Sequence, residues 1–285
     1  MSRIEVQGIG KSFGSVRALD MVSFSIAENQ ITGLLGRNGA GKSTLMRILA
    51  GWTFPDQGSA RVGGQEVTPG ESPDLYLMSE MDLYPDGMNP LKAFRYGRRL
   101  YKDFDEAYAR RLAEKFRLPL KTNINRLSTG YRSIFKIIMA LSVNTPVVMF
   151  DEPVLGLDAN HRELFYRVLL EKYAEHPFTA VISTHLIDEL AGLVENVILL
   201  RRGQVLYNGS REELLGQGYT VSGKAADVDR YKEGRPLIGE ESLGGLKAAY
   251  FWGEPAPARI PEGLEVSPLD LQKLFIRLTE EEEER

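Results

Sequence analysis

The chain alternates between two patterns of apolar residues over most of its length. Short apolar runs occur at 31–36, 147–150 and 179–184, and apolar residues at helical spacing occur at 43–51 and about 161–175. Buried runs that alternate with helices are typical of parallel strands joined by crossover helices. We therefore predict an α/β fold with a mostly parallel sheet flanked by helices.

Other segments depart from this pattern. N-terminal antiparallel strands are expected before the first parallel strand, and the turn residues Arg202–Gly203 predict a hairpin. Residues from about 85 to 145 carry many Arg, Lys and Tyr at helical spacing, which predicts an inserted helical subdomain. We predict one α/β domain over 1–215 and a small α+β extension over 216–285, with a helix at 269–279 and a solvated acidic tail at 281–285.

Composition narrows the possible classes of protein. The 285 residues include 35 Lys and Arg against 39 Asp and Glu, so the net charge of −4 gives no reason to expect nucleic acid, although a local basic patch is compatible with it. The absence of cysteine excludes disulfides and thiolate metal sites. No signal peptide is recognised, and no apolar run approaches the ~20 residues that span a bilayer, so a membrane role would need another chain to cross it.

A glycine-rich segment between a strand and a helix has the pattern G-x-x-x-x-G-K-[ST]. In this pattern backbone N–H groups turn toward phosphate oxygens, Lys42 places a cation on the β- and γ-phosphates, and the Ser43 hydroxyl ligates Mg²⁺. The candidate nucleotide-binding residues are Gly36, Arg37, Asn38, Gly39, Ala40, Gly41, Lys42, Ser43 and Thr44. A second match, Gly218–Ala225, ends without a hydroxyl, and we interpret it as a loop of the extension.

Acidic and imidazole side chains follow two of the predicted strands. Asp151 ends an apolar strand and is well placed to hold Mg²⁺, while Glu152 next to it is a candidate general base. His185 follows another buried strand, and in a parallel sheet that end faces the ligand crevice.

The order of these motifs resembles the ATP-binding subunit of ABC transporters over about Ile4–Gly209. The resemblance implies a P-loop NTPase core in which Gly36–Thr44 is the Walker A loop and Asp151 the Walker B aspartate. It further implies that Glu152 is the catalytic glutamate and that His185 contacts the γ-phosphate. Gly156–Asp158 would be the loop that communicates across a dimer. Phe13 would stack on adenine, the alternative being a core phenylalanine.

The stretch Leu127–Tyr131, "LSTGY", resembles the family's signature motif LSGGQ. The resemblance implies that Ser128 and Gly130 contact ATP on a second subunit. Thr129 and Tyr131 replace a glycine and a glutamine, and Thr129 would crowd the γ-phosphate.

The family glutamine that ligates Mg²⁺ and senses the membrane partner has no counterpart here. The corresponding position is Ser79, followed by Glu80. A carboxylate is the better magnesium ligand, so we favour Glu80, with Ser79 as the alternative.

The implied function is ATP hydrolysis that powers transport through a separate integral membrane permease, with ATP and Mg²⁺ as cofactors. ATP would lie between two such subunits, in a homodimer or with a close paralogue. The protein would be cytoplasmic, held on the inner face of the membrane by the permease, and the variant motifs favour an exporter. The alternative is an ABC-type ATPase that acts on ribosomes or DNA, but this chain has one competent loop and no sustained heptads.

Overall fold

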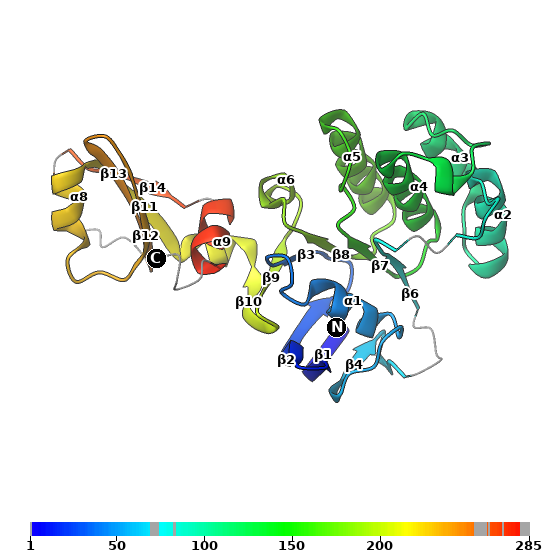
Figure 1. The fold of residues 1–285 in the computed structure, drawn as a ribbon, viewed down its shortest axis with the longest axis horizontal. Helices are drawn as coiled ribbons and strands as arrows, with labels where there is room; N and C mark the ends of the chain where they lie inside the picture. Colours follow the sequence, from blue (N-terminus) through cyan, green and yellow to red (C-terminus); the bar gives the residue numbers. More distant parts are fainter. Residues whose placement is uncertain are drawn as a thin grey trace. The chain divides into compact units, whose positions relative to one another are not determined.

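The computed structural model describes residues 2–68, 74–81, 84–253, 261, 263–269 and 271–279 (Figure 1). The chain divides into two compact units, each described by itself below. Unit 1 comprises Met1–His185 with Asn196–Asn208, and unit 2 comprises Leu186–Glu195 with Gly209–Arg285. The predicted acidic tail at 281–285 lies outside the described residues.

A six-stranded sheet forms the centre of unit 1, with the order β10-β9-β3-β8-β7-β6. Every residue of β3, β7 and β8 is buried, because a parallel sheet is covered on both faces. The strands are β3 (Ile31–Leu35), β6 (Leu75–Met78), β7 (Val147–Asp151), β8 (Thr179–Thr184), β9 (Asn196–Arg201) and β10 (Gln204–Ser210). β6, β7, β8, β3 and β9 pair in parallel, which confirms the predicted α/β core.

The predicted hairpin is present as β9 and β10. Arg202 and Gly203 both have positive φ angles, 49° and 78°, as a two-residue turn of the primed kind requires. This turn is the antiparallel edge of an otherwise parallel sheet.

An antiparallel sheet packs over one side of the central sheet, as predicted for the N-terminal strands. Its order is β2-β1-β4-β5, with β1 (Ser2–Phe13), β2 (Val16–Ala27), β4 (Gln57–Val62) and β5 (Gln65–Glu66). Together with α1 (Lys42–Leu49) it shares one core with the central sheet, in which Ile4, Leu45 and Met149 are fully buried. Figure 1 shows α1 on this side and α4 (Thr129–Ser142) and α5 (Ala159–Glu175) on the other.

The inserted helical subdomain is confirmed between Tyr84 and Thr145. It contains α2 (Pro90–Leu100), α3 (Glu106–Lys115), the 3₁₀ turn η1 (Ile124–Arg126) and α4. Asn89 and Asp105 cap the first turns of α2 and α3 by accepting backbone N–H bonds. Phe135 of α4 is fully buried, with ring centroids 4.9 Å from Tyr84 and 6.2 Å from Phe94.

Unit 2 contains a four-stranded antiparallel sheet of order β12-β13-β11-β14. Its elements are α6 (Ile187–Ala191), α7 (Arg211–Gly216), β11 (Gly218–Lys224), α8 (Ala225–Lys232), β12 (Leu237–Leu243), β13 (Leu246–Trp252), β14 (Glu265–Pro268) and α9 (Leu271–Thr279). α8 packs against β11 and β13, while α9 contacts α6 and β12. In the described part of the chain, no helix is long and apolar enough to cross a membrane.

The second glycine-lysine match lies on β11, so its interpretation as a loop is wrong. β11 pairs with β13 and β14 along both edges. Tyr219 and Val221 alternate into the core beneath α8. Pairing on both edges and burial of Gly218–Val221 identify a strand and not a phosphate loop.

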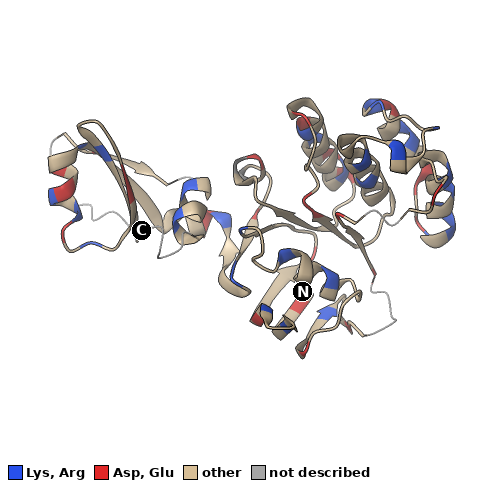
Figure 2. Ribbon diagram, viewed as in Figure 1, with Lys and Arg blue, Asp and Glu red and all other residues tan. Residues whose placement is uncertain are grey.

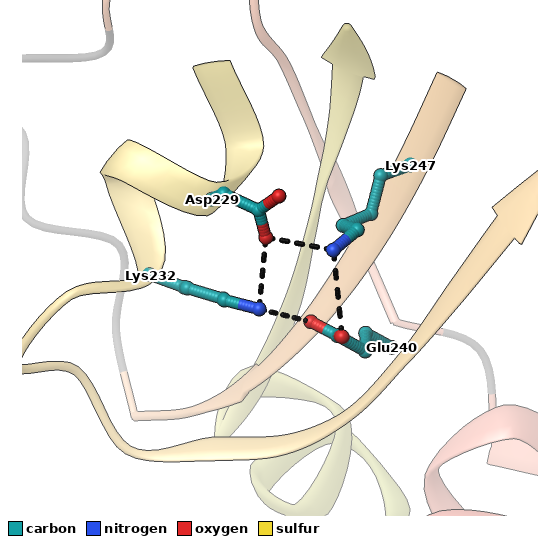
Figure 3. Close-up of polar contacts among 4 residues, drawn as sticks. All are labelled: Asp229, Lys232, Glu240 and Lys247. Carbon is teal, nitrogen blue, oxygen red and sulfur yellow. Dashed lines mark hydrogen bonds and ion pairs between the residues drawn. The ribbon is translucent and has the colours of Figure 1, made fainter. Parts of the chain in front are cut away.

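Four charged residues of unit 2 form a closed ring of ion pairs (Figure 3). Lys232 Nζ lies 2.8 Å from both Asp229 Oδ1 and Glu240 Oε2, and Lys247 Nζ lies 2.7 Å and 3.4 Å from the same two carboxylates. The ring ties α8 to β12 and β13. Hydrogen bonds from Lys232 lower the pKa of Asp229 and of Glu240, and the same bonds raise the pKa of Lys232.

Because the ring of Phe135 is buried, we expect its removal to lower the stability of the protein strongly. Phe135→Ala removes the side chain that joins α2 to α4, and a buried Phe→Ala change costs about 3–5 kcal/mol of unfolding free energy. Urea denaturation followed by circular dichroism measures this loss. Leu100→Ala is the control: Leu100 is 76% exposed, so its effect stays within about 0.5 kcal/mol. Equal effects of the two substitutions would contradict this packing.

The ring of charges predicts that unit 2 loses stability in acid. Because the folded pKa values of Asp229 and Glu240 are lowered, their contribution is present above the ordinary carboxyl pKa of about 4 and is lost as the pH falls. Trp252 of β13 reports on unit 2 once the other tryptophan is removed by Trp52→Phe. In that background, thermal unfolding read by fluorescence shifts down between neutral pH and acid. Adding Lys232→Met makes this shift smaller, and an unchanged shift would show that the ring does not stabilise the unit.

Candidate functional site

The glycine-rich segment forms a tight loop between β3 and α1. Gly41 precedes the helix with φ 105°, and a Cβ atom there would lie 2.5 Å from the carbonyl oxygen of Ala18, so only glycine fits. Gly41 is the N-cap of α1 and supplies no side-chain hydrogen bond to the first turn. The N–H groups of this turn and the positive end of the helix dipole therefore face into the loop, which is the arrangement that binds phosphate.

Lys42 begins α1 and its side chain is only 6% exposed. Its ammonium group donates hydrogen bonds to the carbonyl oxygens of Gly36 (2.7 Å) and Arg37 (3.3 Å) and lies 3.8 Å from Glu152 Oε1. Burial lowers the pKa of Lys42, while the nearby carboxylates of Glu152, Asp151 and Glu80 act in the opposite direction. The loop thus holds a cation against the protein's own carbonyl and carboxylate oxygens.

Asp151 ends β7 beside β8, with Ser183 as its strand partner. The carboxyl group is buried, and its Oδ1 atom has no hydrogen-bond partner among the described residues. An ionised oxygen without a partner is costly in a protein interior unless a cation approaches it. This orphaned oxygen therefore fits the chemistry of a magnesium ligand.

Glu152 and His185 meet at the ends of neighbouring strands. Glu152 Oε2 lies 2.9 Å from His185 Nδ1, and the backbone N–H of Glu152 donates to Ser183 O at 3.0 Å. Glu152 has a positive φ of 46°, a left-handed conformation that is uncommon for a residue with a side chain. Such strain is concentrated at functional sites. The Glu152 carboxylate therefore lies between an ammonium group and an imidazole.

The two candidates for the missing glutamine differ in their surroundings. Ser79 is buried, whereas Glu80 is exposed. The charge of the Glu80 carboxylate raises the pKa of Lys42, while the Glu80 carbonyl oxygen accepts a hydrogen bond from Lys136 Nζ at 2.8 Å. The choice between Glu80 and Ser79 stays a prediction.

Phe13 lies at the end of β1 and is 53% exposed. Lys11 Nζ lies 5.4 Å from the centre of its ring. An exposed ring contributes little to a core, so the alternative of a core phenylalanine is wrong. The position remains available for stacking on a base.

The signature-like segment forms the start of α4. Ser128 is the N-cap, and its Oγ accepts the backbone N–H of Tyr131 at 3.3 Å. Ser128 and Gly130 line a pocket of about 460 Å³ together with Gly156 and Asp158. Of the lining residues, Gly156 and Asp158 belong to the loop before α5.

The substituted residues of the signature contact the Gly156–Asp158 loop. The Thr129 methyl group packs against Gly156, and a Cβ atom on Gly130 would lie 2.7 Å from Gly156 O. The Tyr131 ring meets the His161 ring edge-on at 6.4 Å. Thr129 is therefore packed against its own chain.

Two residues at this site were not predicted from the sequence. His161 Nδ1 lies 2.9 Å from Asp158 Oδ2, and Ser133 Oγ donates to Leu155 O at 2.9 Å. The spacing Asp-x-x-His at a helix start was a usable signal, because Asp158 also accepts the backbone N–H of His161 at 2.9 Å as the N-cap of α5. Ser133 had no such signal.

Comparison with known proteins identifies the family. The family model for "ABC transporter" matches residues 19–155. The "Probable sulfate/thiosulfate import ATP-binding protein CysA" of Chlorella vulgaris is 32% identical over 74% of this chain and 92% of the relative. The ABC transporter ATP-binding protein NatA of Bacillus subtilis is 30% identical over 70% of this chain and 84% of the relative. The ribose import protein RbsA of Pseudomonas putida is 32% identical, but the match covers only 42% of that protein.

Solved structures share the fold. An ATP-binding subunit of an ABC transporter superposes with a TM-score of 0.66 and 23% identity over 75% of this chain and 92% of that one. A dimeric bacterial ABC transporter cassette gives the same score with 20% identity, covering 73% of this chain and 98% of that one. Both confirm the predicted P-loop NTPase architecture.

The family model and the relatives cover the phosphate loop, the strand-end carboxylates and the helical subdomain, which the structure places in one unit. The chain therefore belongs to the ATP-binding subunits of ABC transporters, a family that hydrolyses ATP.

Proposed function

We propose that the chain binds ATP on the Gly36–Thr44 loop and hydrolyses it with Glu152 to power a membrane transporter. One observation carries this proposal: the Glu152 carboxylate lies between Lys42 and His185, beside the orphaned Oδ1 of Asp151. A cation for phosphate, an acceptor for a metal and a base for water thus gather at one edge of the sheet.

Asp151 and Ser43 would hold Mg²⁺, with Glu80 as a further ligand. The described residues contain no group of three or more His, Cys, Asp or Glu that could hold a metal by themselves. This suits magnesium, which keeps several waters and binds through one or two carboxylates plus substrate phosphates. When bound, the ion neutralises charge on the phosphate oxygens.

Glu152 would accept a proton from the attacking water. Its partner His185 would hold the carboxylate in place through Nδ1 and present the opposite edge of the ring to the γ-phosphate. Lys42 would leave the carbonyl oxygens of Gly36 and Arg37 for the more strongly negative phosphate oxygens. Phe13 would stack on adenine.

A second subunit would complete each site. Ser128, the N–H of Gly130 and the positive end of α4 would form an anion-binding surface for ATP held by another chain. Two copies, or this chain and a close paralogue, would therefore meet head to tail, each capping the other's γ-phosphate. The packing of Thr129 against Gly156 keeps its methyl group away from the phosphate approach.

The membrane permease would bind in a groove of about 650 Å³ between the core of unit 1 and the helical subdomain. Trp52, Met81 and Leu100 line it, and their exposed fractions are 47%, 48% and 76%. Large apolar side chains exposed along a groove are typical of a protein interface. Ser79 also lines this groove, next to Glu80, which would connect the permease to the metal.

This binding would hold the protein at the inner face of the membrane. The direction of transport stays a prediction: the motif variants favour export, whereas CysA and RbsA are named as import proteins.

Removing the cation of the phosphate loop tests ATP binding. Lys42→Ala should weaken ATP binding and lower kcat by about 100-fold or more, because loss of one charged phosphate contact has that effect. Titration with ATP and a phosphate-release assay measure both. Lys224→Ala is the matched control, since Lys224 ends the second glycine-lysine match on β11. Normal turnover in Lys42→Ala, or equal losses in both variants, would contradict the assignment of Lys42 to phosphate binding.

Removing the proposed base tests the shared site. Glu152→Gln should reduce hydrolysis by roughly 10²–10⁴-fold and leave ATP binding intact, so that ATP holds two chains together. Size-exclusion chromatography with and without ATP detects the dimer. Glu171→Gln on the exposed side of α5 should behave as the wild type. A Glu152→Gln chain that binds ATP but stays monomeric would argue against the head-to-tail arrangement.

A further inference from the structure

The helical subdomain concentrates the positive charge of the chain. Residues 85–145 contain 13 Lys and Arg against 5 Asp and Glu, although acidic residues outnumber basic ones overall, 39 to 35. Figure 2 shows Lys and Arg along α2 and α3. This concentration of basic residues produces a positive local potential, although the net charge of the whole chain is −4.

The basic residues are most regularly spaced on the outer face of α2. The buried residues Pro90, Ala93, Phe94 and Gly97 occupy one side of this helix. The opposite side carries Lys92, Arg95, Tyr96 and Arg99, which follow the i, i+3, i+4, i+7 spacing of one helical face and are all exposed. We refer to these four residues as the α2 basic face. It contains no acidic residue.

The cations of this face are not used inside the protein. In the part of the chain that the structure describes, none of Lys92, Arg95 and Arg99 forms an ion pair. Lys92 Nζ donates to the carbonyl oxygen of Gly87 at 3.1 Å, and the Arg99 guanidinium lies 5.9 Å from the centre of the Tyr96 ring. Arg98, which lies off this face, does pair with Glu106, at 3.7 Å. The face therefore presents three charges to the surroundings.

We infer that the α2 basic face binds a membrane surface that carries anionic phospholipid headgroups. Basic side chains near such a surface gain about 1 kcal/mol each, and a tyrosine between them has the amphipathic character of interfacial residues.

The surface is also continuous with the proposed permease groove. Leu100 and Tyr101, at the end of α2, line that groove. In this respect the inference rests on the proposed function, since a chain docked there would have α2 beside a membrane protein.

Nucleic acid fits this face less well. Recognition of single strands uses aromatic rings as stacking platforms, and Tyr96, the single ring of the face, lies beneath Arg99. Helix α2 has 11 residues, so it spans roughly 16 Å and contacts few phosphates. An extended charged bilayer surface suits a short cationic helix better.

Co-sedimentation of the full chain with lipid vesicles tests the inference. The chain should bind vesicles of phosphatidylglycerol mixed with phosphatidylcholine at low salt. It should not bind phosphatidylcholine alone, and about 0.5 M salt should release it, because the screening length is then only a few Å. The combined substitution Lys92→Gln, Arg95→Gln, Arg99→Gln should weaken binding roughly 100-fold, about five-fold for each charge.

The matched control removes three exposed cations from elsewhere. Arg61→Gln, Lys224→Gln and Arg230→Gln change the net charge equally and lie outside the helical subdomain, so binding should stay near the wild-type level. Equal losses in both triple variants, or wild-type binding by the α2 variant, would overturn the inference. So would tighter binding to a mixed-sequence DNA duplex that strips the chain from vesicles, which would assign the face to nucleic acid.

The outcome is separable from the proposed ATPase function. Vesicle binding is measured without ATP, and the three α2 residues lie outside the nucleotide site. The α2 variant should keep wild-type ATP hydrolysis in solution, which also shows that it folds. If the α2 variant lost both hydrolysis and vesicle binding, the loss of binding would result from misfolding and would count against the inference drawn from that variant.

Discussion

The buried ammonium group of Lys42 is the charge around which the rest of the site is arranged. A cation that is 6% exposed needs compensation, and it receives it from the carbonyl oxygens of Gly36 and Arg37 and from the carboxylate of Glu152. Burial lowers its pKa while the nearby carboxylates oppose this change. The same environment favours a phosphate, which offers more negative charge and better acceptors than backbone carbonyl groups.

The parallel sheet brings the acidic groups to this cation. β7 and β8 end side by side, so Asp151, Glu152 and His185 emerge at one edge. The left-handed backbone of Glu152 turns the chain sharply after β7, and its N–H is tied to Ser183 O. Strain of this kind is retained where the surrounding structure enforces it, and here it sets the carboxylate against both the ammonium and the imidazole.

The signature-like segment shows how a helix cap serves a second purpose. Ser128 caps α4 in the ordinary way. Contacts of Thr129 with Gly156, Ser133 with Leu155, and Tyr131 with His161 then bind this helix start to the loop before α5. The two segments proposed to face a second subunit are therefore one connected surface, and the residues that replace glycine and glutamine in "LSTGY" take part in the connection.

Local pattern was sufficient for most of the elements and indicated the candidate site residues. The glycines of the phosphate loop, the apolar strand before Asp151 and the turn at Arg202–Gly203 are each encoded within about ten residues, where hydrogen bonding and backbone sterics decide the outcome. β11 is the exception, because its glycines and lysine favoured a loop whereas its pairing with β13 and β14 places it in a sheet.

Only the tertiary structure decided which distant residues meet. The contact of Glu152 with Lys42, the influence of Glu80 on that lysine, the packing of Thr129 on Gly156 and the exposure of Phe13 depend on strand order and on packing between segments far apart in the chain. Local residue patterns carry no direct information on such contacts, because the free energy that forms them comes from burying surfaces of several elements together.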